Sequence, residues 1–268
     1  WGNDVEAGGA IMQRRNVLLW ISAALVYLFL YLPLVIVVVF SFNDSRLNAE
    51  WVGFTWKWYG KLFHNQEMLT AAMNSLIIAA VSVVVATVLG TLAALAMEQA
   101  RLRLLQMLVL APIAMPEILM GVSLLVLFIM VNMTLGLLSI MLAHITFCIG
   151  FVALAVQARI SSMDPGLVEA ARDLGASPWR CFREITLPLL MPGIMAGALM
   201  AFTLSIDDFV ITFFTAGVGS STLPLQIYSM VKIAVTPEVN AVSTLLMLLT
   251  LVVITVASRL SPAVFRGE

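Results

Sequence analysis

The sequence predicts an all-α polytopic membrane protein with six transmembrane helices, and three observations support this fold class. Hydrophobic residues make up 62% of the 268 residues and charged residues only 11%, whereas soluble domains average about 45–50% and about 25%. The mean hydropathy is +1.04. Charged residues are also separated by apolar stretches as long as the roughly 20 residues that a spanning helix needs. This composition excludes a cytosolic globular enzyme, a disordered chain and a nucleic-acid binder.

The gaps between charged residues place the six spans in order. The long uncharged stretch after Glu117 holds the end of one span and all of the next, because Asn132 and Gly136 interrupt it. Within the third span, Pro112 and Pro116 each remove a backbone donor, which predicts a break or kink there. The expected spans lie near residues 17–41, 69–97, 104–131, 135–158, 189–215 and 237–259.

Basic residues predict the orientation of these spans. Most of them fall in the segments on the same side as the N-terminus, so the positive-inside rule places both termini in the cytoplasm. The expected organisation is a cytoplasmic tail at residues 1–16, a transmembrane domain at 17–259 and a second cytoplasmic tail at 260–268. We expect no cleavable signal peptide, because the first apolar run has the full length of a span.

Residues 217–235 lie between the fifth and sixth spans and are too few to cross the membrane. They predict an interfacial or re-entrant helix on the outer side. Thr236, Pro237 and Glu238 then supply a cap, a first-position proline and a first-turn acid, which predicts the start of the last helix.

Residues 159–186 form the one long polar loop on the cytoplasmic side. Asp164 and Pro165 are typical of a helix start, and Gly175 of a helix end. Ser177 and Pro178 then predict a second short helix that runs to residue 185. The pattern fits a surface for another protein and, equally well, a plain amphipathic linker on the membrane.

This loop carries a motif that resembles a known family. In the string EAARDLGASPWRCFREITLP, an EAA triplet is followed by three residues, a glycine, nine residues and then I-x-L-P. The pattern resembles the EAA loop of permease subunits of bacterial ABC importers. The resemblance implies that the loop is a coupling helix that docks into a cytoplasmic ATPase subunit. The residues that it implies for this contact are Glu169, Ala170, Ala171, Asp173 and Gly175.

Further strings between residues 31 and 241 are similar to the polyamine (spermidine/putrescine) permeases. They include YLPLVIVVVFSFNDSR, GFTWKWYGKL, FTLSIDDFVITFF and TLPLQIYSMVK. The resemblance implies the type I permease fold of ABC importers in the bacterial inner membrane. It also implies four kinds of partner besides membrane lipid. These are a second homologous permease subunit, two cytoplasmic ATPase subunits and a periplasmic polyamine-binding protein.

The same resemblance implies that the chain forms half of a translocation pathway and catalyses no reaction. We therefore expect no catalytic residue and no cofactor in this chain, with ATP and Mg²⁺ bound by the separate ATPase. The phosphate-loop pattern GxxxxGK[ST] does not occur in the sequence. His64 and His144 have no ligand at helical spacing, so we expect no metal site.

Apart from Glu238 at the start of the last span, three carboxylates fall inside predicted spans, namely Glu117, Asp207 and Asp208. An ionised side chain at the centre of a spanning helix costs about 2.5–3.5 kcal/mol. These acids are therefore expected to face a cavity or a partner, to be protonated, or to lie near a membrane boundary. Adjacent residues on a helix point about 100° apart, so we do not expect Asp207 and Asp208 to hold one small ion together.

No Lys or Arg lies within a predicted span, apart from Arg259 at the very end of the last one, to pair with these acids, which favours a cationic cargo. The ammonium groups of a polyamine can pair with separated carboxylates and lie over aromatic faces. We therefore predict that Asp207, Asp208 and Glu117 line the pathway with Phe209 and Tyr228. For the two aromatic residues, plain packing is the alternative role.

Other functions remain open from the residues alone. One is an ABC permease for another small solute, such as ferric iron, thiamine or sulfate. Another is an ion-coupled secondary transporter, which would work without an ATPase. An intramembrane enzyme is disfavoured, because the sequence shows neither paired metal ligands nor a nucleophile with its base.

Overall fold

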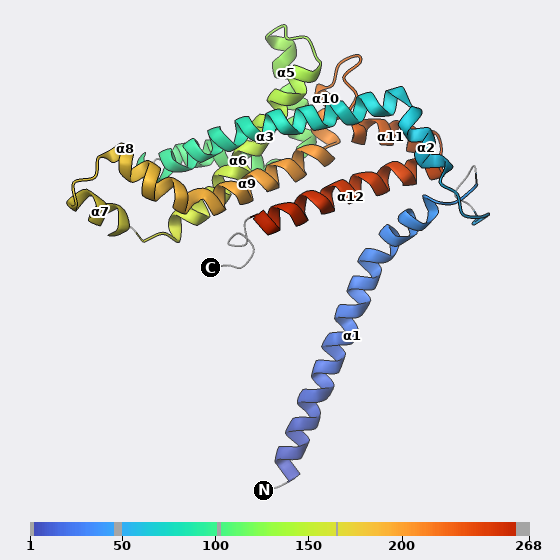
Figure 1. Cartoon of the computed structure of the whole chain (residues 1–268), viewed down its shortest axis with the longest axis horizontal. Coiled ribbons are helices and arrows are strands. Elements are labelled where there is room, and N and C mark those ends of the chain that lie inside the picture. Colours follow the sequence, from blue (N-terminus) through green and yellow to red (C-terminus); the bar gives the residue numbers. More distant parts are fainter. Residues whose placement is uncertain (1–2, 46–49, 101–102, 165, 261–268) are drawn as a thin grey trace. The chain divides into compact units, whose positions relative to one another are not determined.

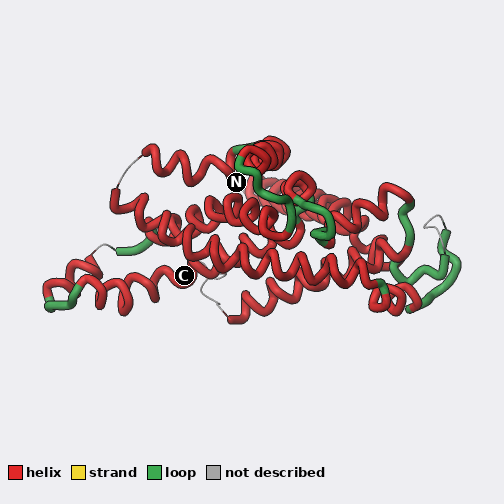
Figure 2. Tube along the Cα trace, turned by 90° about the horizontal axis from the view of Figure 1, so that it is seen from above, coloured by secondary structure: helices red, strands yellow, loops and turns green. Residues whose placement is uncertain are grey.

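The computed structural model describes residues 3–45, 50–100, 103–164 and 166–260. The described residues form helices joined by loops (Figure 2). The one extended pairing among them is the isolated bridge between Asn43 and Phe54. Pro165 and residues 261–268, which figured in the predictions above, lie outside the described residues. The chain divides into two compact units, residues 1–62 with 230–246 and residues 63–229 with 247–268.

The first unit contains α1 (Asn3–Phe40), most of α2 (Lys57–His64) and the start of α12 (Pro237–Leu260). Asn43 holds the segment after α1, because its side chain bonds the carbonyl of Glu50 at 2.7 Å and the amide of Val52 at 2.9 Å. The last helix begins at Pro237, as predicted. Its first-turn acid, Glu238, is buried and accepts a hydrogen bond from Lys61 Nζ at 2.6 Å.

The second unit is a helical bundle in which three long helices pack on one another (Figure 1). These are α3 (Gln66–Ala100), α6 (Leu137–Ser161) and α9 (Leu187–Asp207). The middle of α6 lies in the core, where Val152 and Val156 are fully buried. Gly197 of α9 faces α6 so closely that an added Cβ would lie 3.1 Å from the Cα of Val152. Small residues thus let α9 approach α6, as is common between membrane helices.

The third predicted span is broken, as its two prolines indicate. It consists of α4 (Arg103–Ala114) and α5 (Glu117–Met130), whose axes differ by 111°. Pro112 lies within α4 and Pro116 precedes α5. Five described helices are long and apolar enough to cross a membrane, and the count becomes six if the bent pair is one span.

The fifth predicted span, 189–215, is wrong as a single helix. The structure ends α9 at Asp207 and begins a separate α10 (Val210–Thr215) three residues later. After α10 the chain forms α11 (Leu223–Ile233), which is the short helix predicted within residues 217–235.

The cytoplasmic loop also differs from its prediction at one end. The helix α7 (Gly166–Asp173) is present, and α8 (Pro178–Cys181) begins where Ser177 and Pro178 predicted it. The prediction that this second helix ends at residue 185 is wrong. The helix α8 ends at Cys181, and a π-helical turn, Phe182–Thr186, connects it to α9. The backbone is therefore helical from α8 into α9.

Candidate functional site

The break between α9 and α10 places the predicted acids in different environments. Asp207 is the last residue of α9 and its side chain is exposed. Asp208 has extended backbone, with φ −62° and ψ 124°, and its side chain is only 5% exposed. Two neighbours in sequence therefore face different surroundings, because α9 ends between them and not because of their angular separation on one continuous helix.

The carboxylate of Asp208 caps the first turn of α10. Its Oδ1 accepts a hydrogen bond from the amide of Ile211 at 3.2 Å, and its Oδ2 accepts one from the amide of Thr212 at 2.8 Å. The Thr212 hydroxyl donates to Oδ2 as well, at 2.8 Å. A carboxylate at a helix N-terminus satisfies backbone donors that have no partner within the helix. This cap is the reason that the chain restarts a helix at Val210.

His144 of α6 completes the surroundings of Asp208. Its Nε2 lies 3.2 Å from Asp208 Oδ2 and 3.0 Å from Thr212 Oγ1, and its Nδ1 lies 2.8 Å from Ser205 Oγ. His144, Ser205 and Thr212 are all buried. A proton on Nε2 can be shared between Asp208 Oδ2 and Thr212 Oγ1, while Nδ1 accepts from the Ser205 hydroxyl. The four side chains join α6, α9 and α10.

This network is not among the predictions from the sequence, in which His144 is a candidate metal ligand only. A signal for its other members is present in the sequence. Ser205, Asp208 and Thr212 follow one another at spacings of three and four residues, so they would share one face of a continuous helix. Their partner on α6 could not be identified, since nothing in the linear sequence pairs residue 144 with residue 208.

The other two predicted acids lie at the surface of the second unit. Glu117 is in the first turn of α5 and is exposed, directly after Pro116. Glu117 begins α5, and Asp207 ends α9 shortly before α10 begins. Because α5 packs against α10, the two exposed acids lie at the breaks of neighbouring helices. The third acid, Asp208, lies in the buried network with His144.

The predicted aromatic partners also meet at this break. The ring centroids of Phe209 and Tyr228 are 4.5 Å apart, and those of Phe209 and Phe213 are 5.6 Å apart. Tyr228 is 44% exposed and Phe213 is 51% exposed, so their rings are not enclosed by packing within this chain. Exposed aromatic faces next to acids form an arrangement that can bind an organic cation.

The predicted coupling residues lie on or directly after α7, at the opposite end of α9. Glu169, Ala170 and Asp173 are exposed, and Ala171 is half-buried. Gly175 has φ +84°, which suits a glycine that ends a helix. The amide of residue 176 bonds the carbonyl of Ala171 at 3.0 Å, and the amide of Gly175 bonds that of residue 172 at 2.9 Å. These two bonds form a Schellman motif, which fixes the end of α7.

The two sites are about 30 Å apart along α9, which has 21 residues. The π-helical turn connects the α7–α8 elbow to α9 without a flexible linker. A rigid-body movement of α7 would therefore be transmitted to the helix that ends at Asp207.

The sequence of this chain is similar to those of characterised transport proteins. It is 44% identical over 238 residues to the spermidine/putrescine transport system permease protein PotC of Escherichia coli (strain K12), covering 88% of this chain and 90% of that one. It is 42% identical over 231 residues to the putrescine transport system permease protein PotI of the same organism, covering 82% of each.

Solved structures of ABC importers share the fold. A chain of a bacterial alginate ABC transporter, solved in complex with an alginate pentasaccharide-bound periplasmic protein, aligns with a TM-score of 0.72 at 17% identity, covering 94% of this chain and 96% of that one. A chain of the inward-facing MetNI methionine ABC transporter aligns with a TM-score of 0.62 at 20% identity, covering 79% and 99%.

Residues 86–266 match the family model described as binding-protein-dependent transport system inner membrane component. The matched region includes both broken helices, the network around His144 and the α7–α8 elbow. The chain therefore belongs to the family of inner membrane components of binding-protein-dependent transport systems, and it is a multi-pass, non-enzymatic permease subunit of an ABC importer.

Proposed function

We propose that this permease forms half of a translocation pathway for polyamines such as spermidine and putrescine. Support comes from the two relatives above, whose names specify these cargoes and which match most of the chain. The observation in the structure that carries the proposal is that two exposed acids, Asp207 and Glu117, lie at the breaks of neighbouring helices. The ring of Phe209, two residues after Asp207, packs against that of Tyr228. The helices α5, α9 and α10 contain no Lys or Arg that could neutralise these acids.

The proposed mechanism uses the two ends of α9 for different tasks. At one end, Asp207 and Glu117 bind ammonium groups by charge, while Phe209 and Tyr228 provide cation–π contacts. At the other end, Glu169 and its neighbours on α7 dock into a cytoplasmic ATPase subunit. Closure of the ATPases would move α7 and, through the π-helical turn, α9. The pathway would then open alternately to either side of the membrane.

The proposed assembly contains a second homologous permease subunit, two ATPase subunits and a periplasmic polyamine-binding protein. ATP and Mg²⁺ bind to the ATPase subunits, and this chain requires no cofactor of its own. Both termini lie in the cytoplasm, on the same side as α7. The break between α9 and α10 then lies towards the outer side.

ATP-dependent uptake of radiolabelled spermidine into proteoliposomes tests the proposal. The vesicles contain the complete complex and receive the binding protein from outside. Unlabelled putrescine is expected to reduce uptake, whereas ferric iron, thiamine and sulfate are not. Uptake of one of these other solutes, with no uptake of spermidine, would overturn the polyamine assignment and leave the permease class intact. Uptake without any ATPase would instead indicate an ion-coupled transporter.

A further inference from the structure

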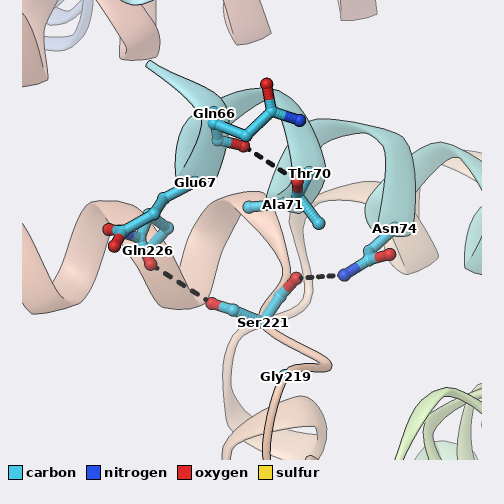
Figure 3. Close-up of a pocket in the computed structure, with 8 residues that line it drawn as sticks. All are labelled: Gln66, Glu67, Thr70, Ala71, Asn74, Gly219, Ser221 and Gln226. Carbon is cyan, nitrogen blue, oxygen red and sulfur yellow. Dashed lines mark hydrogen bonds between the residues drawn. The ribbon is translucent and has the colours of Figure 1, made fainter.

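A cavity with mostly polar lining residues lies in the second unit, and none of the acids at the helix break belongs to its lining. It has a volume of about 300 Å³ and is formed by the first turns of α3, the loop that precedes α11 and the first turns of α11 (Figure 3). A volume of this size is at the lower end of the range for small-molecule sites. Its lining consists of Gln66, Glu67, Thr70, Ala71, Asn74, Gly219, Ser221 and Gln226.

The floor of the cavity is fixed by buried hydrogen bonds. Asn74 is 8% exposed, and its Nδ2 donates to the carbonyl of Ser221 at 2.9 Å, as Figure 3 shows. The neighbouring Ser75 is 3% exposed, and its hydroxyl accepts from the amide of Leu223 at 2.8 Å. These two bonds attach the loop and the start of α11 to α3. The cavity therefore exists before any ligand arrives, which lowers the entropic cost of binding.

The rim of the cavity carries one carboxylate, that of Glu67. Glu67 is exposed, and its recorded hydrogen bond within the cavity is a long one, 3.5 Å from Gln226 Nε2 to Oε2. All eight lining residues are described, and none of them is Lys, Arg or His. The hydroxyls of Thr70 and Ser221 and the amide oxygen of Gln226 add acceptors around the carboxylate.

We propose that this cavity is an outer subsite for one primary ammonium group of the cargo. An ammonium presents three donors and no acceptor, and the cavity offers one negative charge surrounded by neutral oxygens. A divalent metal fits less well, because no group of three or more His, Cys, Asp or Glu side chains among the described residues could hold one. The subsite rests on the polyamine function proposed above. It adds a second place, besides Asp207 and Glu117, where this chain contacts the cargo.

Thiol labelling can locate binding at this cavity, because both native cysteines, Cys148 and Cys181, are buried and react slowly. The variant Thr70→Cys places a thiol on the exposed rim. This replacement removes only the bond from the Thr70 hydroxyl to the carbonyl of Gln66. Labelling by a neutral maleimide is followed on this chain by mass spectrometry, in the assembled complex, with spermidine as the probe.

Spermidine at about two to four times its Kd for the cavity is expected to slow labelling of Thr70→Cys by about three- to five-fold, because the fraction of empty cavities falls by that factor. The protection should be lost in the double variant that carries both Thr70→Cys and Glu67→Gln. Ser229→Cys, an exposed position on α11 outside the cavity lining, is the matched control and should show no protection. Gln66→Cys serves as a second rim position if Thr70→Cys does not assemble. Mg²⁺ at equal ionic strength should not protect either rim position.

Protection that persists in the Glu67→Gln background, or equal protection by Mg²⁺, would overturn the subsite. The same preparations are assayed for spermidine uptake. Uptake without protection at the rim would contradict the subsite and leave the polyamine function standing. A complex that takes up no spermidine at all would contradict the function itself.

Discussion

His144 Nε2 lies 3.2 Å from Asp208 Oδ2, although the two residues are 64 positions apart in the chain. This contact joins the most buried helix of the bundle, α6, to the point where α9 ends and α10 begins. The two adjacent aspartates therefore differ in role. Asp208 is buried and bonds residues on both sides of the break, whereas Asp207 is exposed.

The two aspartates are expected to respond differently to the same substitution. Asp208→Asn replaces one carboxylate oxygen with an amide nitrogen, a donor that cannot take the place of Oδ2, which accepts three buried hydrogen bonds. The variant should be less stable by about 1–3 kcal/mol. Asp207→Asn should leave stability within about 0.5 kcal/mol, because its side chain is exposed. Thermal unfolding of the purified complex in detergent measures the difference. Equal melting temperatures for the two variants would contradict the assignment.

Spermidine uptake should depend on Asp207 through direct contact with the cargo, although the stability of the protein does not depend on this residue. Asp207→Asn is expected to reduce spermidine uptake about tenfold in fully assembled complexes, since a hydrogen bond to a charged group is worth roughly 1.5–3 kcal/mol. Glu117→Gln should have a similar effect. Normal uptake by both variants would show that these two acids do not contact the cargo. Glu50→Gln, an exposed acid remote in sequence from the break, is the control.

A double-mutant cycle tests the contact between His144 and Asp208 directly. We expect His144→Ala and Asp208→Asn to be non-additive, with a coupling free energy of about 1 kcal/mol or more, as is typical of residues in one hydrogen-bond network. The same cycle with His144→Ala and Asp207→Asn should be additive. Chemical unfolding of the purified protein gives all the free energies, and additivity in the first cycle would disprove the network.

The coupling role of α7 predicts that Glu169→Lys abolishes association with the ATPase but leaves the fold intact, because Glu169 is exposed. Glu184→Lys is the matched control, since it reverses an exposed acid of the same elbow that pairs with Arg180 at 3.0 Å. Co-purification of the ATPase with each variant is the measurement. Retention of the ATPase by Glu169→Lys would contradict the coupling role.

Gly217 is expected to tolerate no side chain. A Cβ at this position would overlap the carbonyl of Leu135, which belongs to the turn before α6. Gly217→Ala should therefore displace the loop before α11, which lines the cavity in Figure 3, and lower the unfolding free energy by at least about 1 kcal/mol. Gly53→Ala is the control, because an added Cβ there has no neighbour within 4 Å. Thermal unfolding of both variants tests this.

Much of the fold could be predicted because apolar runs and helix signals are local. Pro237 at the start of α12 and Gly175 after α7 act through their own backbone, and both predictions are confirmed. The 111° bend between α4 and α5 is different. Two prolines predict a break, but the angle depends on packing of α5 against α10, which the sequence does not reveal.

The sequence identified the acids and aromatic residues of the candidate site, but it did not predict how their side chains are arranged. The apolar residues that follow Asp208 favoured one continuous span through residue 215. The side chain of Asp208 instead caps a new helix with a hydrogen bond from Thr212 and meets His144 from another helix. Long-range contacts of this kind decide which of two neighbouring acids is exposed. The assignments of Asp207, Glu117, Phe209 and Tyr228 to the cargo remain predictions.

The break between α9 and α10 also has an electrostatic consequence that involves no side chain of the pathway. The carboxyl end of a helix carries roughly half a negative elementary charge, and the amino end the same amount of positive charge. At the break the positive end of α10 faces Asp208, which neutralises it. The last turn of α9 contains no basic residue that could neutralise the negative end of that helix. The peptide backbone therefore makes this point attractive to cations even when the exposed carboxylates are neutral.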